Sequence, residues 1–171
     1  MVNTVILGID PGYAIVGYGV IGYHASRFAL GGYGAITTEA GLPFETRLGI
    51  IYEETDKLIK LAKPDAIAIE ELFFTTNQKT AIYVSMARGV LILAAVRNNI
   101  PIFEYTPLQV KQSVVGYGRA EKKQVMEMTR LLLKLDEIPK PDDAADALAI
   151  AICHAHTSGS ALNGNFAAKA K

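Results

Sequence analysis

Continuous hydrophobic runs separated by short turns predict that the chain begins with three strands. An aliphatic run over residues 4–9, ended by a Pro-Gly pair, is typical of a strand buried on both faces. Runs rich in Val, Ile and Tyr follow at 14–23 and 28–36, and such short connections predict an antiparallel meander. Gly17, Gly19 and Gly22 weaken the second strand, so we expect another element to pack closely against them.

The hydrophobic period changes to that of a helix after residue 42. Apolar side chains recur every three or four residues up to residue 62, with Glu and Lys between them, which predicts an amphipathic helix. Residues 66–70 form a fourth apolar run, which ends in Glu70. A strand, a helix and a strand in this order predict a right-handed crossover and a parallel pair of strands.

The second half of the chain repeats this alternation. Residues 79–97 predict a helix that is apolar nearly all round. Such a helix is either central to the core or shared with a second subunit, and in a domain this small we favour the second. A fifth strand at 100–105 precedes two helices, at 106–115 and 121–135. The last helix, from 141 to about 156, consists almost wholly of small and aliphatic residues, so it must be buried. The predicted fold is α/β, with a five-stranded mixed sheet: a three-strand antiparallel meander plus two parallel strands, covered by helices on both faces.

Length and composition favour a single domain. The chain has 171 residues, of which 50% are hydrophobic, enough for one core. We expect residues 1–158 to form this domain and residues 159–171 to be a flexible tail. The longest purely apolar run, 90–96, is far shorter than the roughly 18 residues of a membrane span, and the start has no features of a signal peptide. A cytoplasmic location without membrane association is therefore expected, with the single Cys153 as a buried apolar side chain.

The charge is balanced over the whole chain but not along it. The 17 basic and 17 acidic residues give a net charge of zero, which by itself argues against a polyanionic partner. If four of the acidic residues are metal ligands, the remaining balance is 17 minus 13, or +4. Residues 97–140 contain eight basic and five acidic side chains, so this region leans basic.

Four carboxylates stand where the predicted elements would bring them together. Asp10 and Glu70 each end a buried strand, and the ends of neighbouring strands lie about 4.8 Å apart. Asp143 and Asp146 are three residues apart and share a helix face. Buried carboxylates repel each other unless a cation lies between them, and all-oxygen ligands favour Mg²⁺ or Mn²⁺. Two such ions about 3.5 to 4 Å apart can hold a phosphate and activate a water molecule.

Each of these residues also has an ordinary interpretation. Asp10 could belong to a turn, and Glu70 could face solvent at a strand end. Asp142 and Asp143 could cap the last helix, and for Asp142 we prefer that interpretation. Asp146 lies in the second turn of an apolar helix, where a cap is no longer needed. The combination is therefore more specific than any single position.

Eight segments together resemble, in order and spacing, the RuvC family of Holliday-junction resolvases, over roughly residues 4–156. They are 6–12, 68–73, 87–90, 103–105, 110–112, 114–116, 120–122 and 143–151. The resemblance implies an RNase H-like fold, a homodimer, and two Mg²⁺ ions per active site, with Mn²⁺ able to substitute. It further implies paired nicks across a four-way DNA junction that leave 5′-phosphate and 3′-hydroxyl ends, in homologous recombination and DNA repair. A branch-migration helicase complex of the RuvA and RuvB type is the implied partner, in the bacterial cytoplasm at the nucleoid.

The resemblance also assigns residues. By match of motif, the catalytic and metal-binding carboxylates are those quoted above: Asp10, Glu70, Asp143 and Asp146. Some relatives carry His at the last position, whereas this chain has Asp.

Basic and aromatic residues are matched to the DNA in the same way. Lys111 and Lys122 match lysines near the scissile phosphate, and Arg119 and Lys123 are expected to contact DNA as well. Phe73 matches an aromatic residue that stacks on an unpaired base near the crossover. Without the resemblance, the lysines would be interpreted as solvated side chains and Phe73 as a hydrophobic anchor.

Three other functions remain open from the sequence. Residues 8–12 also resemble the first phosphate loop of actin-like ATPases, but those enzymes clamp nucleotide between two domains, so we expect no bound nucleotide or other small-molecule cofactor. An RNase H-like nuclease that acts on RNA or hybrids would share the fold and metal site. A non-catalytic DNA-binding module is least favoured, because it leaves the acidic cluster without a purpose.

Overall fold

The computed structural model, which describes residues 4–72 and 78–161, contains one mixed sheet with the strand order β3-β2-β1-β4-β5. The strands are β1 (Thr4–Asp10), β2 (Ile15–His24), β3 (Arg27–Thr37), β4 (Ala66–Glu70) and β5 (Ile102–Tyr105). Strands β1, β2 and β3 pair antiparallel, whereas β4 pairs parallel with both β1 and β5. The predicted meander and the two parallel strands are both confirmed.

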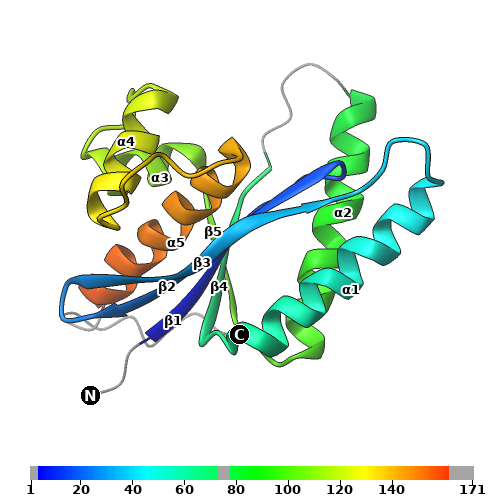
Figure 1. Cartoon of the computed structure of the whole chain (residues 1–171), viewed down its shortest axis with the longest axis horizontal. Coiled ribbons are helices and arrows are strands. Elements are labelled where there is room, and N and C mark those ends of the chain that lie inside the picture. The colour runs from blue at the N-terminus through cyan, green and yellow to red at the C-terminus, as the bar shows by residue number, and fades with distance from the viewer. Residues whose placement is uncertain (1–3, 73–77, 162–171) are drawn as a thin grey trace.

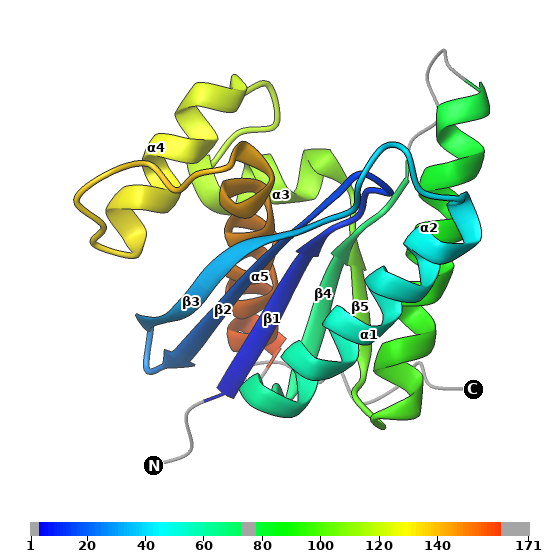
Figure 2. The ribbon, with the colours of Figure 1, turned by 45° about the vertical axis from the view of Figure 1, so that its right-hand side comes forward.

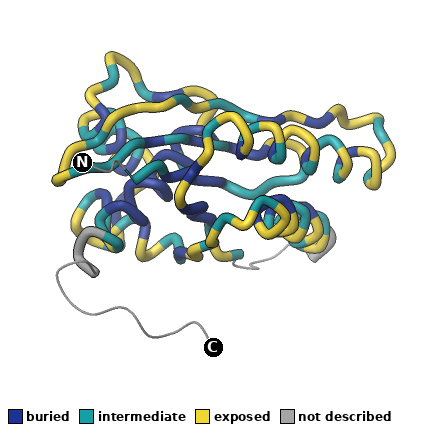
Figure 3. The backbone as a smooth tube through the Cα atoms, turned by 90° about the horizontal axis from the view of Figure 1, so that it is seen from below, coloured by how far each residue is buried: buried dark blue, intermediate teal, exposed yellow. Residues whose placement is uncertain are grey.

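Helices cover both faces of the sheet, as predicted. They are α1 (Phe44–Ala62), α2 (Gln78–Arg97), α3 (Pro107–Val115), α4 (Lys122–Leu132) and α5 (Asp142–Ala161). Helices α1 and α2 lie together on one face, and α5 lies on the other with α3 and α4 beside it (Figure 1). The buried residues gather along the middle of the molecule, between the sheet and these helices (Figure 3).

Helix α5 packs directly against the backbone of the central strands, and Figure 2 shows it running behind β1 and β2. A Cβ atom added to Gly8 would lie 2.0 Å from the carbonyl oxygen of Ala147. One added to Gly17 would lie 2.0 Å from that of Asp143, and Gly19 lies against Leu148. The glycines are required because the helix backbone occupies the space that a side chain would need. The close packing predicted at Gly17 and Gly19 is therefore confirmed, whereas at Gly22 it is wrong, because a Cβ atom there would make only ordinary contact with Ala29 at 3.7 Å.

The ends of several elements differ from the predicted limits. Helix α3 begins as predicted, because Thr106 and Gln109 form a reciprocal capping box. Helix α4 ends at Leu132, earlier than expected. Helix α5 continues to Ala161, so the predicted tail is helical at its start, whereas residues 162–171 lie outside the described residues.

Helix α2 has two apolar faces with different surroundings. Its inner face packs in the core between α1 and the sheet and consists of Ala87, Leu91, Ala94 and Ala95. Its outer face is at least half exposed and consists of Ile82, Met86, Leu93 and Val96. Within the described residues, the segment Thr80–Arg97 is the one helix long and apolar enough to span a membrane. Only 22% of this segment is buried, so most of its apolar surface is not covered by the rest of the chain.

Candidate active site

Two carboxylates lie at the same edge of the sheet. Asp10 is the last residue of β1 and Glu70 is the last residue of β4. These strands are parallel neighbours, with Ile9 opposite Ile69 in the register. Asp10 and Glu70 each come directly after one of these paired residues. The ends of the two strands are therefore separated by about 4.8 Å, the spacing of adjacent strands. The sequence predicted this arrangement on the condition that β1 and β4 were neighbours, and that condition is met.

The first turns of α5 bring Asp143 and Asp146 to this edge. Gly17 of β2 is paired with Asp10, and the same glycine lies directly beneath the backbone of Asp143. The contact places the start of α5 over the ends of β1 and β2. All four predicted carboxylates therefore gather at one end of the sheet, from β1, β4 and α5.

The electrostatics of these side chains show that they interact. Burial and, to a smaller extent, the charges of Glu70, Asp146 and Asp143 together raise the pKa of Asp10 to about 8, against the opposing charge of Lys122. Burial also raises the pKa of Glu70, and Asp146 adds to this effect. The pKa of Asp146 is raised by burial as well, against the hydrogen bond and charge of Lys122. This is the behaviour of buried carboxylates that lack enough compensating positive charge.

Lys122, the first residue of α4, supplies part of that charge. Its Nζ lies 2.9 Å from a carboxylate oxygen of Asp146 and 3.7 Å from one of Asp142. The hydrogen bond to Asp146 is the main reason that the pKa of Lys122 is raised. The structure therefore brings this predicted phosphate-binding lysine into the acidic cluster.

Three of the other predicted DNA-binding residues lie on elements around α5, and the fourth lies outside the residues that the structure describes. Lys111 is on α3, Arg119 is on the connection from α3 to α4, and Lys123 is on α4 next to Lys122. Arg119 and Lys123 are exposed and Lys111 is half-buried. Phe73 lies outside the described residues. The described basic residues therefore come from the elements that pack beside α5.

The donor set fits a hard divalent cation. Within the described ranges, no three Asp, Glu, His or Cys side chains are close enough to hold one ion as they stand. Burial, and after it the charge of neighbouring carboxylates, raises the pKa of Asp10 and of Glu70, so these carboxylates also repel one another when they are ionised. Carboxylate oxygens are the ligands that Mg²⁺ and Mn²⁺ prefer, so a bound cation would relieve this repulsion and draw the side chains together.

Arg88 is a residue near this site that the sequence analysis did not single out. It lies on α2, where its Nε donates a hydrogen bond of 3.3 Å to the backbone carbonyl of Glu70. Its guanidinium also pairs with Glu104 of β5 at 2.7 Å. A single arginine in the middle of an otherwise apolar helix was the signal that could have revealed it. Arg88 ties the end of β4 to α2 and to the neighbouring strand.

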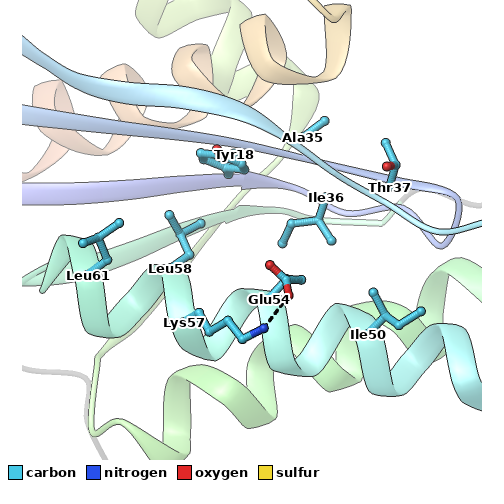
Figure 4. Close-up of a pocket in the computed structure, with 9 residues that line it drawn as sticks. All are labelled: Tyr18, Ala35, Ile36, Thr37, Ile50, Glu54, Lys57, Leu58 and Leu61. Atoms are coloured by element: carbon cyan, nitrogen blue, oxygen red, sulfur yellow. Dashed lines mark hydrogen bonds and ion pairs between the residues drawn. The ribbon is translucent and has the colours of Figure 1, made fainter.

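A groove elsewhere in the molecule contains none of these residues. It lies between α1 and strands β2 and β3 and has a volume of about 500 Å³ (Figure 4). Apolar residues such as Tyr18, Ile36 and Leu58 line it, together with an ion pair between Lys57 and Glu54 of 2.7 Å. The acidic cluster is therefore separate from this groove.

This fold and this arrangement of carboxylates define the class of RNase H-like nucleases. The structure of the yeast mitochondrial Holliday junction resolvase Ydc2 is similar at the level of the fold alone, with a TM-score of 0.67, 15% identity, and coverage of 94% of this chain and 82% of that one.

The sequence identifies the family more narrowly. The model of the family described as crossover junction endodeoxyribonuclease RuvC matches residues 6–154. The enzyme of that name from Alkaliphilus oremlandii is 60% identical over 153 residues, which cover 90% of this chain and 93% of the relative. A structure of Thermus thermophilus RuvC in complex with Holliday junction substrate has a TM-score of 0.87 and 36% identity, covering 91% of this chain and 94% of that one. The chain belongs to the RuvC family of crossover junction endodeoxyribonucleases, as the resemblance of its segments implied, and is therefore a hydrolase.

Proposed function

We propose that this chain resolves four-way DNA junctions by paired hydrolysis of two phosphodiester bonds at the acidic cluster. Its family consists of metal-dependent endodeoxyribonucleases that act on crossover junctions in recombination and repair. The observation that carries the proposal for this chain is the convergence of Asp10, Glu70, Asp143 and Asp146, in which burial and the neighbouring charges together raise the pKa of Asp10 to about 8.

The four carboxylates would hold two Mg²⁺ ions, with Mn²⁺ able to substitute. When bound, such ions supply an activated water molecule and stabilise the leaving oxygen of a phosphate. The chain's own residues place oxygen ligands on three elements, with Asp10 paired to Gly17 of β2, which lies beneath the start of α5. Hydrolysis in this geometry leaves 5′-phosphate and 3′-hydroxyl ends, which a ligase can rejoin.

The basic side of the site would hold the DNA backbone. Lys122 is the best supported residue, because its ammonium group already lies beside Asp146 and can contact a phosphate there. Lys111, Arg119 and Lys123 would extend this contact along α3 and α4. Phe73 follows Glu70 closely in the sequence, and we propose that it stacks on an unpaired base near the crossover.

A homodimer would place two such sites on opposed strands. The exposed apolar stripe of α2, with Met86 and Leu93 near its middle, supports this assembly because a stripe of this length is unfavourable in water. A symmetric dimer uses the same surface on both subunits. We further propose that the dimer works with a branch-migration helicase complex of the RuvA and RuvB type in the bacterial cytoplasm, at the nucleoid and without membrane attachment.

The decisive test replaces single carboxylates with the isosteric amide. Asp10→Asn and Asp146→Asn should each lower cleavage of a synthetic four-way junction by roughly 10³-fold or more in Mg²⁺, because metal ligation contributes several kcal/mol to catalysis. Binding of the junction, measured by gel shift, should survive. A linear duplex and an RNA–DNA hybrid serve as substrate controls, and neither should be cut comparably.

Asp142→Asn is the matched control variant. Asp142 is the first residue of α5, and Asn caps a helix as well as Asp does, so this variant should cut the junction nearly as fast as the original chain. Normal cleavage by Asp10→Asn or Asp146→Asn would show that the carboxylate assignment is wrong.

A further inference from the structure

A buried arginine holds the turn that follows Asp10. Arg47 projects from α1 and is only 8% exposed. Its Nε donates a hydrogen bond of 2.8 Å to the hydroxyl of Thr38, and its Nη2 donates one of 3.2 Å to the backbone carbonyl of Tyr13. The guanidinium carbon also lies 4.7 Å from the centre of the Tyr13 ring. Arg47 therefore contacts both the backbone and the side chain of Tyr13.

Neighbouring elements hold the same turn. The hydroxyl of Thr38, just after β3, donates a hydrogen bond of 2.6 Å to the Tyr13 carbonyl, and its backbone N–H donates one of 3.0 Å to Ala14. The Tyr13 ring lies 6.1 Å from that of Phe44 and 5.5 Å from that of Tyr83. The turn is thus held by α1, by the end of β3 and by α2.

Movement of this turn would move Asp10 relative to the other carboxylates. The turn connects Asp10 to β2, where the paired residue Gly17 lies beneath Asp143. The turn is also tightly closed, since a Cβ atom on Gly12 would lie 2.0 Å from the carbonyl oxygen of Ile15. It cannot shift without disturbing a strand that contacts the start of α5.

The chemistry of the buried group favours a positioning role over simple packing. Burying a guanidinium is costly unless its donors are satisfied, and an apolar side chain of similar volume often stabilises a core more. In the described part of the chain, the hydrogen bonds of Arg47 go to a hydroxyl and a carbonyl at this one turn. The guanidinium group of Arg47 donates these hydrogen bonds from a planar fork. Neither an apolar residue nor a lysine has donors in this arrangement.

We propose that Arg47 is a positioning residue for the metal site, which acts through the Tyr13 carbonyl to hold Asp10 in reach of the bound cation. The inference rests on the proposed function, because it takes Asp10 as a metal ligand. Arg47 itself contacts neither the cation nor the DNA.

Metal binding without DNA tests this role directly. Mn²⁺ titrated into Arg47→Met by calorimetry should bind about threefold to tenfold more weakly than to the original chain, less than the 10- to 100-fold typical of groups that hydrogen-bond directly to a metal ligand, because Arg47 acts on Asp10 through the turn. The Mg²⁺ concentration for half-maximal junction cleavage should rise by a similar factor, while the KM for the junction stays unchanged. Arg47→Lys keeps the charge but not the two-armed geometry, so it should recover only part of the affinity.

Two variants separate positioning from general loss of stability. Ile59→Ala removes a buried side chain of the same helix, three turns away from Arg47, and should leave Mn²⁺ affinity unchanged. Thr38→Val is nearly isosteric and removes the hydroxyl on the same carbonyl, so it should weaken Mn²⁺ binding even if Arg47→Met fails to fold.

Equal Mn²⁺ affinity of the original chain, Arg47→Lys and Thr38→Val would overturn the inference, and so would an equal loss in Ile59→Ala. Failure of the proposed function would look different. In that case the original chain itself would show neither Mn²⁺ binding at the acidic cluster nor Mg²⁺-dependent cleavage.

Discussion

The ionisation of Asp10 is strongly opposed by its surroundings. Burial and three other carboxylates raise its pKa to about 8, and the ammonium group of Lys122 compensates only in part. The carboxylates that make the site suitable for a cation thus destabilise the protein when the cation is absent. Metal binding and proton binding compete at this position, because each neutralises the same charge.

The stabilisation that Mg²⁺ gives should therefore increase with pH. The pKa of Asp10 in the folded, metal-free chain, about 8, exceeds its ordinary value of 3.8, so between these values the folded state holds a proton that the unfolded state has lost. The stability of the metal-free protein falls as pH rises through this window, whereas Mg²⁺ replaces the proton. The rise in melting temperature on adding Mg²⁺ should be larger at about pH 9 than at about pH 6.

Scanning calorimetry with and without Mg²⁺ measures this difference. Asp10→Asn should show a small Mg²⁺ effect that varies much less with pH, because its amide does not titrate. An equal gain at both pH values in the original chain would contradict the assignment of Asp10 as the site of competition.

Helices α5 and α2 have different roles: α5 carries part of the site, and α2 packs in the core and exposes an apolar face. Helix α5 is made of small side chains, which let its backbone approach Gly8 and Gly17 and carry Asp143 and Asp146 to the strand ends. Helix α2 buries one face against α1 and the sheet and ties β4 through Arg88. Its opposite face remains apolar and exposed, which suits a contact between subunits.

A charge in the middle of the exposed face of α2 should dissociate the dimer. Leu93 is 50% exposed in the single chain, and Leu93→Arg would bury an unpaired charge in the proposed interface. The expected cost of about 3 kcal/mol corresponds to dimerisation weaker on the order of 100-fold. Sedimentation equilibrium of the two proteins measures it.

Leu61→Arg is the control for this substitution. Leu61 is 84% exposed on α1, so the same change there should leave the oligomeric state unaltered. A dimer that persists in Leu93→Arg at the original affinity would remove α2 from the subunit contact.

At the scale of the whole molecule, the fold brings basic side chains next to the acidic cluster. The net charge is zero, yet the acidic cluster is concentrated at one end of the sheet and the basic residues of α3 and α4 lie beside it. A DNA backbone at this site would meet lysines and arginines next to the carboxylates. Net charge alone therefore says little about affinity for DNA in this protein.

Removal of a phosphate contact should reduce the salt dependence of junction binding. Lys122→Ala should lower the slope of log K against log salt concentration by about 0.9, the value for one lost phosphate contact, and should also slow cleavage. Fluorescence anisotropy over a series of salt concentrations measures the slope. Lys60→Ala, on α1 across the sheet from the site, should leave the slope unchanged. The same slope for both variants would exclude Lys122 from the path of the DNA.

The hydrophobic pattern was enough to predict the elements and the class of fold. Period-two and period-3.6 patterns are local properties of the backbone, so the strands, the helices and the mixed sheet followed from them. The same pattern placed Asp10 and Glu70 at strand ends and Asp143 and Asp146 on one helix face. Element limits were less certain, as α4 and α5 show, because capping and packing compete with propensity there.

Only the tertiary structure decided whether these carboxylates meet. Their convergence depends on Gly17 beneath Asp143, which no local period reveals. Arg47 lies in an amphipathic helix among charged residues, where its sequence pattern is that of a surface side chain, yet it is buried against the turn after Asp10. Lys122 likewise contacts Asp146, although the helix that carries Lys122 begins 20 or more residues earlier in the chain. Such contacts join segments far apart in sequence, so they are set by the packing of elements on one another and not by the pattern within any element.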